Sequence, residues 1–180
     1  MALHADATAT LTGWNPPDAE QAELREHYLK YLAQNEDGMW RSSRPEHLTA
    51  SALVVDSSGT RALLTLHKTV NAWLQLGGHC EAGDTTLAGA AMREATEESG
   101  LAGLEIEPVP LQLSRHRILA GGCRDTYHLD VQFLVRATTS TQYVVSEESH
   151  DLAWFAMEAL PDGIDHAVAE LAKKAYRQVT

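Results

Sequence analysis

The chain has 180 residues, of which 44% are apolar and 22% are charged, and its formal net charge is -11. These values are typical of one globular domain and argue against extended disorder. No cluster of Lys and Arg is present to neutralise a nucleic-acid backbone, so the sequence excludes a nucleic-acid polymer as partner. An acidic protein that binds a phosphate ligand needs a metal ion or a local Arg to reverse the sign of the charge.

The two cysteines, Cys80 and Cys123, lie in neither a CxxC motif nor a zinc-type spacing with histidine. We therefore expect two reduced thiols. No apolar run approaches the roughly 20 residues that cross a bilayer, and the first residues lack the pattern of a signal peptide. The sequence predicts a cytoplasmic protein that does not contact a membrane.

The first half of the chain predicts one helix followed by strands. Asp18 follows a Pro-Pro turn and is a suitable N-cap for an amphipathic helix over 19–35. Residues 48–55 and 61–67 are rich in apolar and β-branched side chains and enclose a Ser-Ser-Gly turn, which indicates a hairpin. A short apolar segment over 73–76 then leads into Gly77 and Gly78.

The second half predicts a helix over 85–99, ended by Gly100 as C-cap, and a closing helix over 164–177. Strands are expected over 106–118, 127–137 and 152–157. Helices and strands do not alternate strictly, so we predict an α+β fold with a mixed sheet.

Three acidic residues share one side of the predicted helix over 85–99. Glu94, Glu97 and Glu98 are three and four residues apart, while Ala90 and Ala95 lie on the opposite side. Clustered carboxylate oxygens favour Mg²⁺ or Mn²⁺. Taken alone, such residues are more often a solvated face, but the preceding glycine-rich loop makes the combined pattern more specific.

This glycine loop and acidic helix resemble the Nudix box, the signature of the Nudix hydrolase superfamily. The matching positions are Gly78, Arg93, Glu94, Ala95, Glu97, Glu98, Gly100 and Leu101. The chain departs from the pattern at Asp84, where the family usually has Glu, and in having one extra residue between Asp84 and Arg93. The resemblance implies an α/β/α sandwich with a mixed β-sheet over 41–180, with 1–40 as a helical extension packed on it.

The resemblance also implies roles for individual residues. Glu94, Glu97 and Glu98 would bind Mg²⁺, or Mn²⁺, with the carbonyl of Gly78, and Arg93 would orient these carboxylates. The general base stays open between Glu97, Glu98 and a downstream glutamate, for which Glu148 is preferred over its neighbour. An exposed loop charge is an equally good interpretation of Glu148.

Three further residues are candidates for substrate binding. Arg115 could contact a phosphate, although a basic residue on an exposed strand is the commoner case. His128 and Asp130 alternate on a predicted strand and therefore share a face, where they could line the cleft. His47 and His79 flank the predicted site, but we do not expect either to bind magnesium, which prefers oxygen ligands.

The implied activity is Mg²⁺-dependent cleavage of a diphosphate bond in a nucleoside-diphosphate-linked small molecule, with the substrate left open. One alternative is a non-catalytic Nudix-like ligand-binding domain. Another is an enzyme like isopentenyl-diphosphate isomerase, which would need a nucleophilic cysteine such as Cys80. The N-terminal helix could pack on the domain, close the cleft or form the contact of a homodimer.

Overall fold

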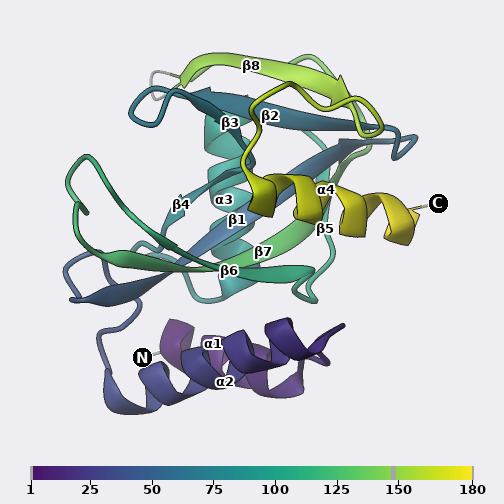
Figure 1. The fold of residues 1–180 in the computed structure, drawn as a ribbon. Helices are drawn as coiled ribbons and strands as arrows, with labels where there is room; N and C mark the ends of the chain where they lie inside the picture. Colours follow the sequence, from purple (N-terminus) through teal and green to yellow (C-terminus); the bar gives the residue numbers. More distant parts are fainter. Residues whose placement is uncertain (1, 147–148, 180) are drawn as a thin grey trace.

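A long parallel pair of strands forms the centre of the sheet in this computed structural model. The structure describes residues 2–146 and 149–179, and these residues contain one eight-stranded sheet and four helices (Figure 1). The strands are β1 (Glu46–Asp56), β2 (Arg61–His67), β3 (Ala72–Leu74), β4 (Leu76–His79), β5 (Leu104–Ile106), β6 (Gln112–Arg117), β7 (Tyr127–Ala137) and β8 (Ser149–Ala156). The helices are α1 (Ala2–Gly13), α2 (Ala19–Gln34), α3 (Leu87–Ser99) and α4 (His166–Val179).

The sheet is mixed, as predicted. β1 and β7 pair in parallel from Glu46↔Tyr127 to Asp56↔Ala137, and every other pair of strands among the described residues is antiparallel. Both strands are buried along most of their length because each is covered on both faces. The other edge of β1 pairs with β2 and β4, and the other edge of β7 pairs with β5 and β6.

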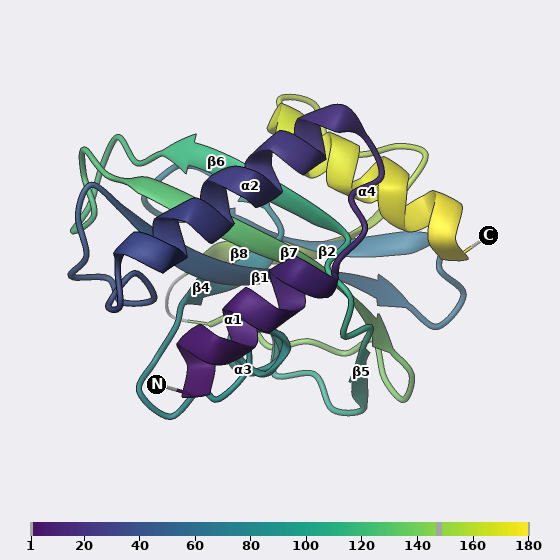
Figure 2. The same ribbon diagram turned by 90° about the horizontal axis from the view of Figure 1, so that it is seen from below.

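The two faces of the sheet are covered by different helices. Leu48, Ala50, Ala52 and Val54 of β1 belong to the same apolar cluster as the buried residues of α1, α2 and α3. Leu53 and Val55, which point to the other face, pack in a second cluster with α4. The predicted α/β/α sandwich is therefore confirmed, and Figure 2 shows α1 and α2 on the near side of the sheet.

The N-terminal extension contains two helices, where the sequence analysis predicted only one. In α1, the buried residues Leu3, Ala7 and Leu11 recur every four positions and so form one stripe. Asp6 of α1 accepts a hydrogen bond from the backbone N–H of Leu87 at 2.8 Å, so it satisfies a free donor at the start of α3. In α2, the side chain of Gln21 donates to the carbonyl of Leu113 and accepts from its N–H.

Two predicted helix caps are confirmed. The side chain of Asp18 accepts from the backbone N–H of Gln21, and Gly100 ends α3 with a left-handed φ of 64°. The predicted strand over 106–118 is wrong as a single element, because residues 107–111 separate β5 from β6. Pro108 and Pro110 lack the N–H that a ladder needs. Within the described part of the chain, no helix is long and apolar enough to span a membrane.

Candidate active site and a neighbouring histidine–cysteine cluster

Helix α3 is capped at both ends, by Thr86 and Gly100, and packs closely against the sheet. The hydroxyl of Thr86 accepts from the N–H of Gly89 at the N-terminus. Small buried residues, Ala90, Ala91 and Ala95, let the helix approach β1 and β4 closely. Its acidic residues are consequently held at fixed positions beside the short strand β4.

Glu94 and Glu98 contact the two glycines of β4. The N–H of Gly77 donates to Glu98 Oε2 at 3.2 Å, and Glu98 is only 7% exposed. A β-carbon at Gly78 would lie 2.8 Å from Glu94 Oε1. Glycine at position 78 therefore makes room for the Glu94 carboxylate, and the Gly77 N–H holds Glu98.

Gly77 has a second reason to be glycine. Its φ is +149°, and a β-carbon there would lie 2.4 Å from the Cα of Ser51 on the neighbouring strand. A side chain at this position would thus meet the backbone of β1, not a side chain that could move away. A side chain is therefore excluded at Gly77 by the backbone of β1 and at Gly78 by the carboxylate of Glu94.

Arg93 ties the loop before α3 to the acidic residues. Its guanidinium forms a two-pronged ion pair with Asp84, at 3.1 Å from Nε to Oδ1 and 3.0 Å from Nη2 to Oδ2. It also donates to Glu94 and Glu97, each at 3.0 Å, and to the carbonyl of His79 at 3.0 Å. The orienting role that the resemblance implied for Arg93 stays a prediction.

The ion pair changes the proton affinity of both partners. Burial raises the pKa of the Asp84 carboxyl, but the hydrogen bonds from Arg93 and from the N–H of Glu81 outweigh it, so the pKa falls below its usual value. The bond to Asp84 is also the largest of several contacts that raise the pKa of Arg93. Asp84 is therefore a charged anchor of the loop, despite its departure from the family pattern.

The three glutamates are not equivalent in the structure. The side chain of Glu94 is 13% exposed and that of Glu97 is 59% exposed, with both bonded to Arg93. Mg²⁺ typically keeps several waters and takes one or two protein carboxylates, so it needs no closed cage. Glu94, Glu97 and Glu98 offer carboxylate oxygens, the kind of donor that Mg²⁺ prefers.

The remaining predicted site residues are dispersed. Glu148 lies outside the described residues. Arg115 of β6 forms an ion pair with Glu46 and stacks at 3.8 Å over the ring of Tyr127. It pairs in register with Leu129, whereas His128 points to the opposite face, so Arg115 and His128 do not share a surface.

Asp130 lies on the face that His128 occupies, but its carboxylate is buried and fully engaged. It is 3% exposed and accepts hydrogen bonds from the hydroxyls of Thr49 (2.9 Å) and Ser51 (2.6 Å). The amides of Gln75 and Gln132 donate to it as well. Asp130 of β7 is thus joined by a polar network to β1 and to Gln75, which lies between β3 and β4.

Cys80 is not suited to act as a nucleophile. Burial, reinforced by the negative charge of nearby Asp84, raises the pKa of the Cys80 thiol to about 12. A thiol that stays protonated reacts poorly, because the thiolate is the reactive form. This counts against the isomerase-like alternative, which needs an ionisable cysteine.

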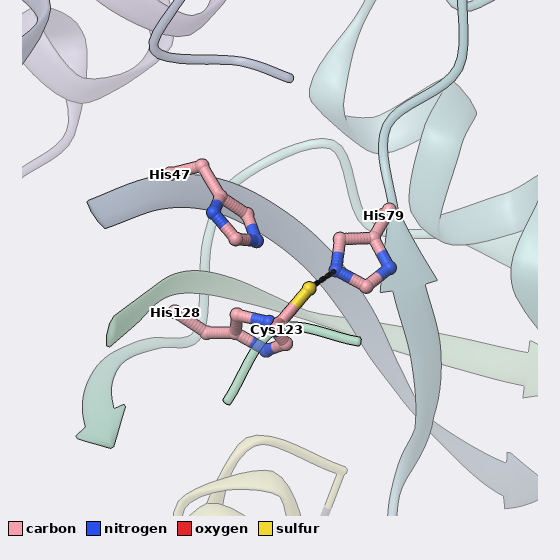
Figure 3. A group of neighbouring side chains, drawn as sticks. All are labelled: His47, His79, Cys123 and His128. Carbon is pink, nitrogen blue, oxygen red and sulfur yellow. Dashed lines mark hydrogen bonds between the residues drawn. The ribbon is translucent and has the colours of Figure 1, made fainter. Parts of the chain in front are cut away.

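The structure also brings together four residues that the sequence analysis did not group. His47 of β1, His79 of β4, His128 of β7 and Cys123 of the loop before β7 place their potential ligand atoms within 4.8 Å of one another (Figure 3). Cys123 Sγ lies 3.3 Å from His79 Nε2. Burial, together with neighbouring positive groups, lowers the pKa of His79 to about 4 and that of His128 to about 2, so both rings are neutral at neutral pH.

Sequence reasoning missed this cluster because its members are far apart in the chain. The only local signal is Cys123 with His128 five residues later, and this pair alone specifies nothing. The cluster depends on strand register, which sets Thr49 opposite His79 and His47 opposite His128.

Three solved structures with a similar fold are distant from this chain in sequence. A NUDIX-family hydrolase from Clostridium perfringens is 24% identical, with 74% of this chain and 98% of that chain covered and a TM-score of 0.63. A C. elegans Ap4A hydrolase is 18% identical, with 73% and 96% covered and a TM-score of 0.61. The E. coli dihydroneopterin triphosphate pyrophosphohydrolase is 17% identical, with 75% and 97% covered and a TM-score of 0.58.

Among curated proteins, none matches this sequence. The family model of the NUDIX domain matches residues 45–178, which include the whole sheet from β1 onward and the glycine–glutamate site of β4 and α3. The resemblance inferred from the Nudix box is thereby confirmed, and this chain belongs to the family of proteins with a NUDIX domain.

Proposed function

We propose that the chain is a Mg²⁺-dependent pyrophosphohydrolase that cleaves a diphosphate bond in a small nucleotide derivative. The observation that carries the proposal is the placement of Glu94 and Glu98 against the glycines of β4, with Arg93 bonded to Glu94 and Glu97. These side chains give an acidic protein a place for a cation, which is what binding of a polyphosphate requires.

In this proposal, Glu94, Glu97, Glu98 and the carbonyl of Gly78 hold Mg²⁺, with Mn²⁺ as a substitute. The bound ion supplies charge neutralisation at the diphosphate and acidifies a water molecule. Arg93 keeps Glu94 and Glu97 in place, and its own bond to Asp84 fixes it relative to the loop. The Gly77 N–H orients Glu98, which is a candidate to accept a proton from the attacking water.

The substrate class is supported by the fold relatives. Proteins of the same fold are named as an Ap4A hydrolase and a dihydroneopterin triphosphate pyrophosphohydrolase, both of which act on phosphate anhydrides. We extend to this chain the common chemistry, a small molecule with a diphosphate linkage. Contacts of Arg115, His128 and Asp130 with that molecule stay predictions, as does a role for Glu148.

The test is a panel of diphosphate compounds, assayed with and without Mg²⁺ for release of a monophosphate. On a cleaved compound, Glu98→Gln is expected to reduce kcat by about 100-fold or more, as loss of a catalytic acid or base typically does. Glu97→Gln should raise the Mg²⁺ concentration needed for half-maximal activity. Glu170→Gln, which changes an exposed helical glutamate paired with Lys173, is the matched control and should behave as wild type.

Two outcomes would contradict the proposal. One is cleavage that does not depend on a divalent cation. The other is wild-type turnover in both Glu97→Gln and Glu98→Gln. Conversion of a diphosphate without release of a monophosphate would instead support an isomerase.

A further inference from the structure

The histidine–cysteine cluster has no part in the chemistry proposed above. His47, His79, Cys123 and His128 come from three neighbouring strands and one loop, and Figure 3 shows their side chains pointing toward one another around a common centre. His47 and Cys123 are 0% and 3% exposed. Four polar side chains have thus been gathered at a largely buried position without a carboxylate among them.

Two nitrogen atoms of this cluster are buried without a hydrogen-bond partner in the described structure: His47 Nε2 and His128 Nε2. The tautomer of His47 follows from its other nitrogen, because Nδ1 lies 3.3 Å from the carbonyl of Ser43 and must donate to it. Nε2 of His47 therefore presents a lone pair to the centre of the cluster. Proteins rarely leave such atoms unpaired, since burying them unsatisfied is unfavourable.

The sulfur of Cys123 has one partner outside the cluster. Arg41 donates from Nε to Cys123 Sγ at 3.3 Å. A donor to the sulfur and a backbone partner for the far nitrogen of a histidine are the outer contacts that orient metal ligands.

The donor set determines which ion fits. Thiolate and imidazole ligands select zinc and similar transition metals, whereas Mg²⁺, Mn²⁺ and Ca²⁺ prefer oxygen. In a tetrahedral zinc site, ligand atoms lie roughly 3.5 Å apart, given bond lengths of about 2.1 Å to nitrogen and 2.3 Å to sulfur. Here the four ligand atoms are within 4.8 Å of one another, and Cys123 Sγ and His79 Nε2 are already 3.3 Å apart.

We propose that His47, His79, Cys123 and His128 form a closed, four-ligand Zn²⁺ site. With four protein ligands, the ion has no open position for substrate, so the site is structural. It fastens the loop over 118–126, which supplies Cys123, to three strands of the sheet. The site is separate from the glutamates, because His79 pairs with Thr49 on one face of β4 while Gly78 faces Glu94 on the other.

The zinc site also adjoins the glutamate site through the backbone. The carbonyl of His79 accepts from Arg93, while its ring belongs to the cluster. Holding the His79 ring in place therefore also holds the backbone carbonyl to which Arg93 donates. Zinc would stabilise the strand that carries both sites without taking part in hydrolysis.

The test is metal analysis of the untagged protein, because the histidines of an affinity tag would bind zinc themselves. We expect one zinc per chain after dialysis against buffer without chelator. Replacement by Co²⁺ should give the visible bands of tetrahedral cobalt and a thiolate-to-cobalt charge-transfer band. Removal of zinc with a chelator should lower Tm, and added Zn²⁺, but not Mg²⁺, should restore it.

Cys123→Ala should weaken zinc affinity by more than about 100-fold and abolish the charge-transfer band, since loss of outer contacts alone costs about 10- to 100-fold. The matched control is Cys80→Ala, which removes the other buried cysteine and should retain both properties. His128→Ala is expected to lose zinc, while His116→Ala, which removes the adjacent ring outside the cluster, should not. If Cys123→Ala fails to fold, the cobalt spectra of wild type and Cys80→Ala still decide whether Cys123 is a ligand.

Two results would overturn the inference: untagged protein that takes up less than stoichiometric zinc even when zinc is supplied, or equal zinc affinity in Cys123→Ala and Cys80→Ala. None of these readouts depends on hydrolytic activity. An inactive protein that binds zinc would therefore refute the proposed hydrolase alone, and an active protein without zinc would refute this site alone.

Discussion

Replacing Gly77 with alanine is the sharpest test of how β4 is built. The new β-carbon would lie 2.3 Å from Ser51 Cβ, 2.4 Å from Ser51 Cα and 2.8 Å from the carbonyl oxygen of Ala50. These are distances that real β-carbons essentially never show, and two of the three atoms belong to the backbone of the central strand. The backbone must therefore move, and residue 77 must in addition adopt a φ of +149° that alanine rarely takes.

The cost can be estimated from these two effects. A residue held in a sparsely populated backbone region costs about 1–3 kcal/mol, and overpacking a tight interior costs about 1–3 kcal/mol more. The smaller entropy of the unfolded alanine chain offsets about 0.4–1 kcal/mol. We expect Gly77→Ala to lower the free energy of unfolding by about 3 kcal/mol, a large part of the 5–15 kcal/mol that is usual for a domain.

Urea unfolding followed by far-UV circular dichroism measures this loss. With an m-value of about 2 kcal/mol/M, the midpoint should fall by about 1.5 M. Gly83→Ala is the matched control, because a β-carbon at Gly83 meets nothing within 4 Å and its φ is not positive. The reasoning is refuted if the two variants unfold at midpoints that differ by less than about 0.5 M.

Two further predictions concern charged residues. Burial raises the pKa of the Asp56 carboxyl, but bonds from Arg61, Ser58 and Thr60 outweigh it and lower the pKa, so the unfolded chain binds more protons and stability falls as pH falls through this range. Asp56→Asn should therefore lower the free energy of unfolding by about 1–3 kcal/mol at pH 7. Urea titrations should show that this difference from wild type shrinks below the usual carboxyl pKa of 3.8. A difference that does not change with pH would contradict the ion pair. Arg93→Lys should reduce kcat/KM by about 10-fold or more, because an ammonium cannot reproduce the fork to Asp84 and the bonds to the two glutamates. Unchanged hydrolysis with unchanged Mg²⁺ dependence in Arg93→Lys would exclude the orienting role.

Local patterns predicted the regular elements well. The strands over 61–67 and 127–137 have the bounds of β2 and β7, and the caps at Asp18 and Gly100 are those observed. These features depend on side chains close together in the sequence. The helix α1 was missed because its Ala- and Thr-rich sequence has little contrast between its faces, and Leu3, Ala7 and Leu11 become buried only against α2 and α3.

In the candidate site, too, local sequence patterns did not predict the contacts between residues that are far apart in the chain. The spacing of Glu94, Glu97 and Glu98 predicted a shared side of one helix, but only the structure shows Glu98 held by the N–H of Gly77 and Glu97 left at the surface. The partners of Arg115 could not be predicted, because Glu46 lies 69 residues away. Groupings of this kind depend on strand order and register, which no local pattern encodes.

Successive residues of the short strand β4 face opposite sides of the sheet, one side toward the acidic helix α3 and the other toward the histidine–cysteine cluster. Gly77 and His79 point to the side of Ser51 and Thr49, and Gly78 points to the side of Glu94. A slip of one residue in the pairing with β1 would reverse every side chain. The imidazole of His79 would then clash with helix α3, and Gly78 would leave an unfilled space in the histidine–cysteine cluster. Deleting or inserting a single residue in β4 should therefore disrupt the glutamate site and the histidine–cysteine cluster together.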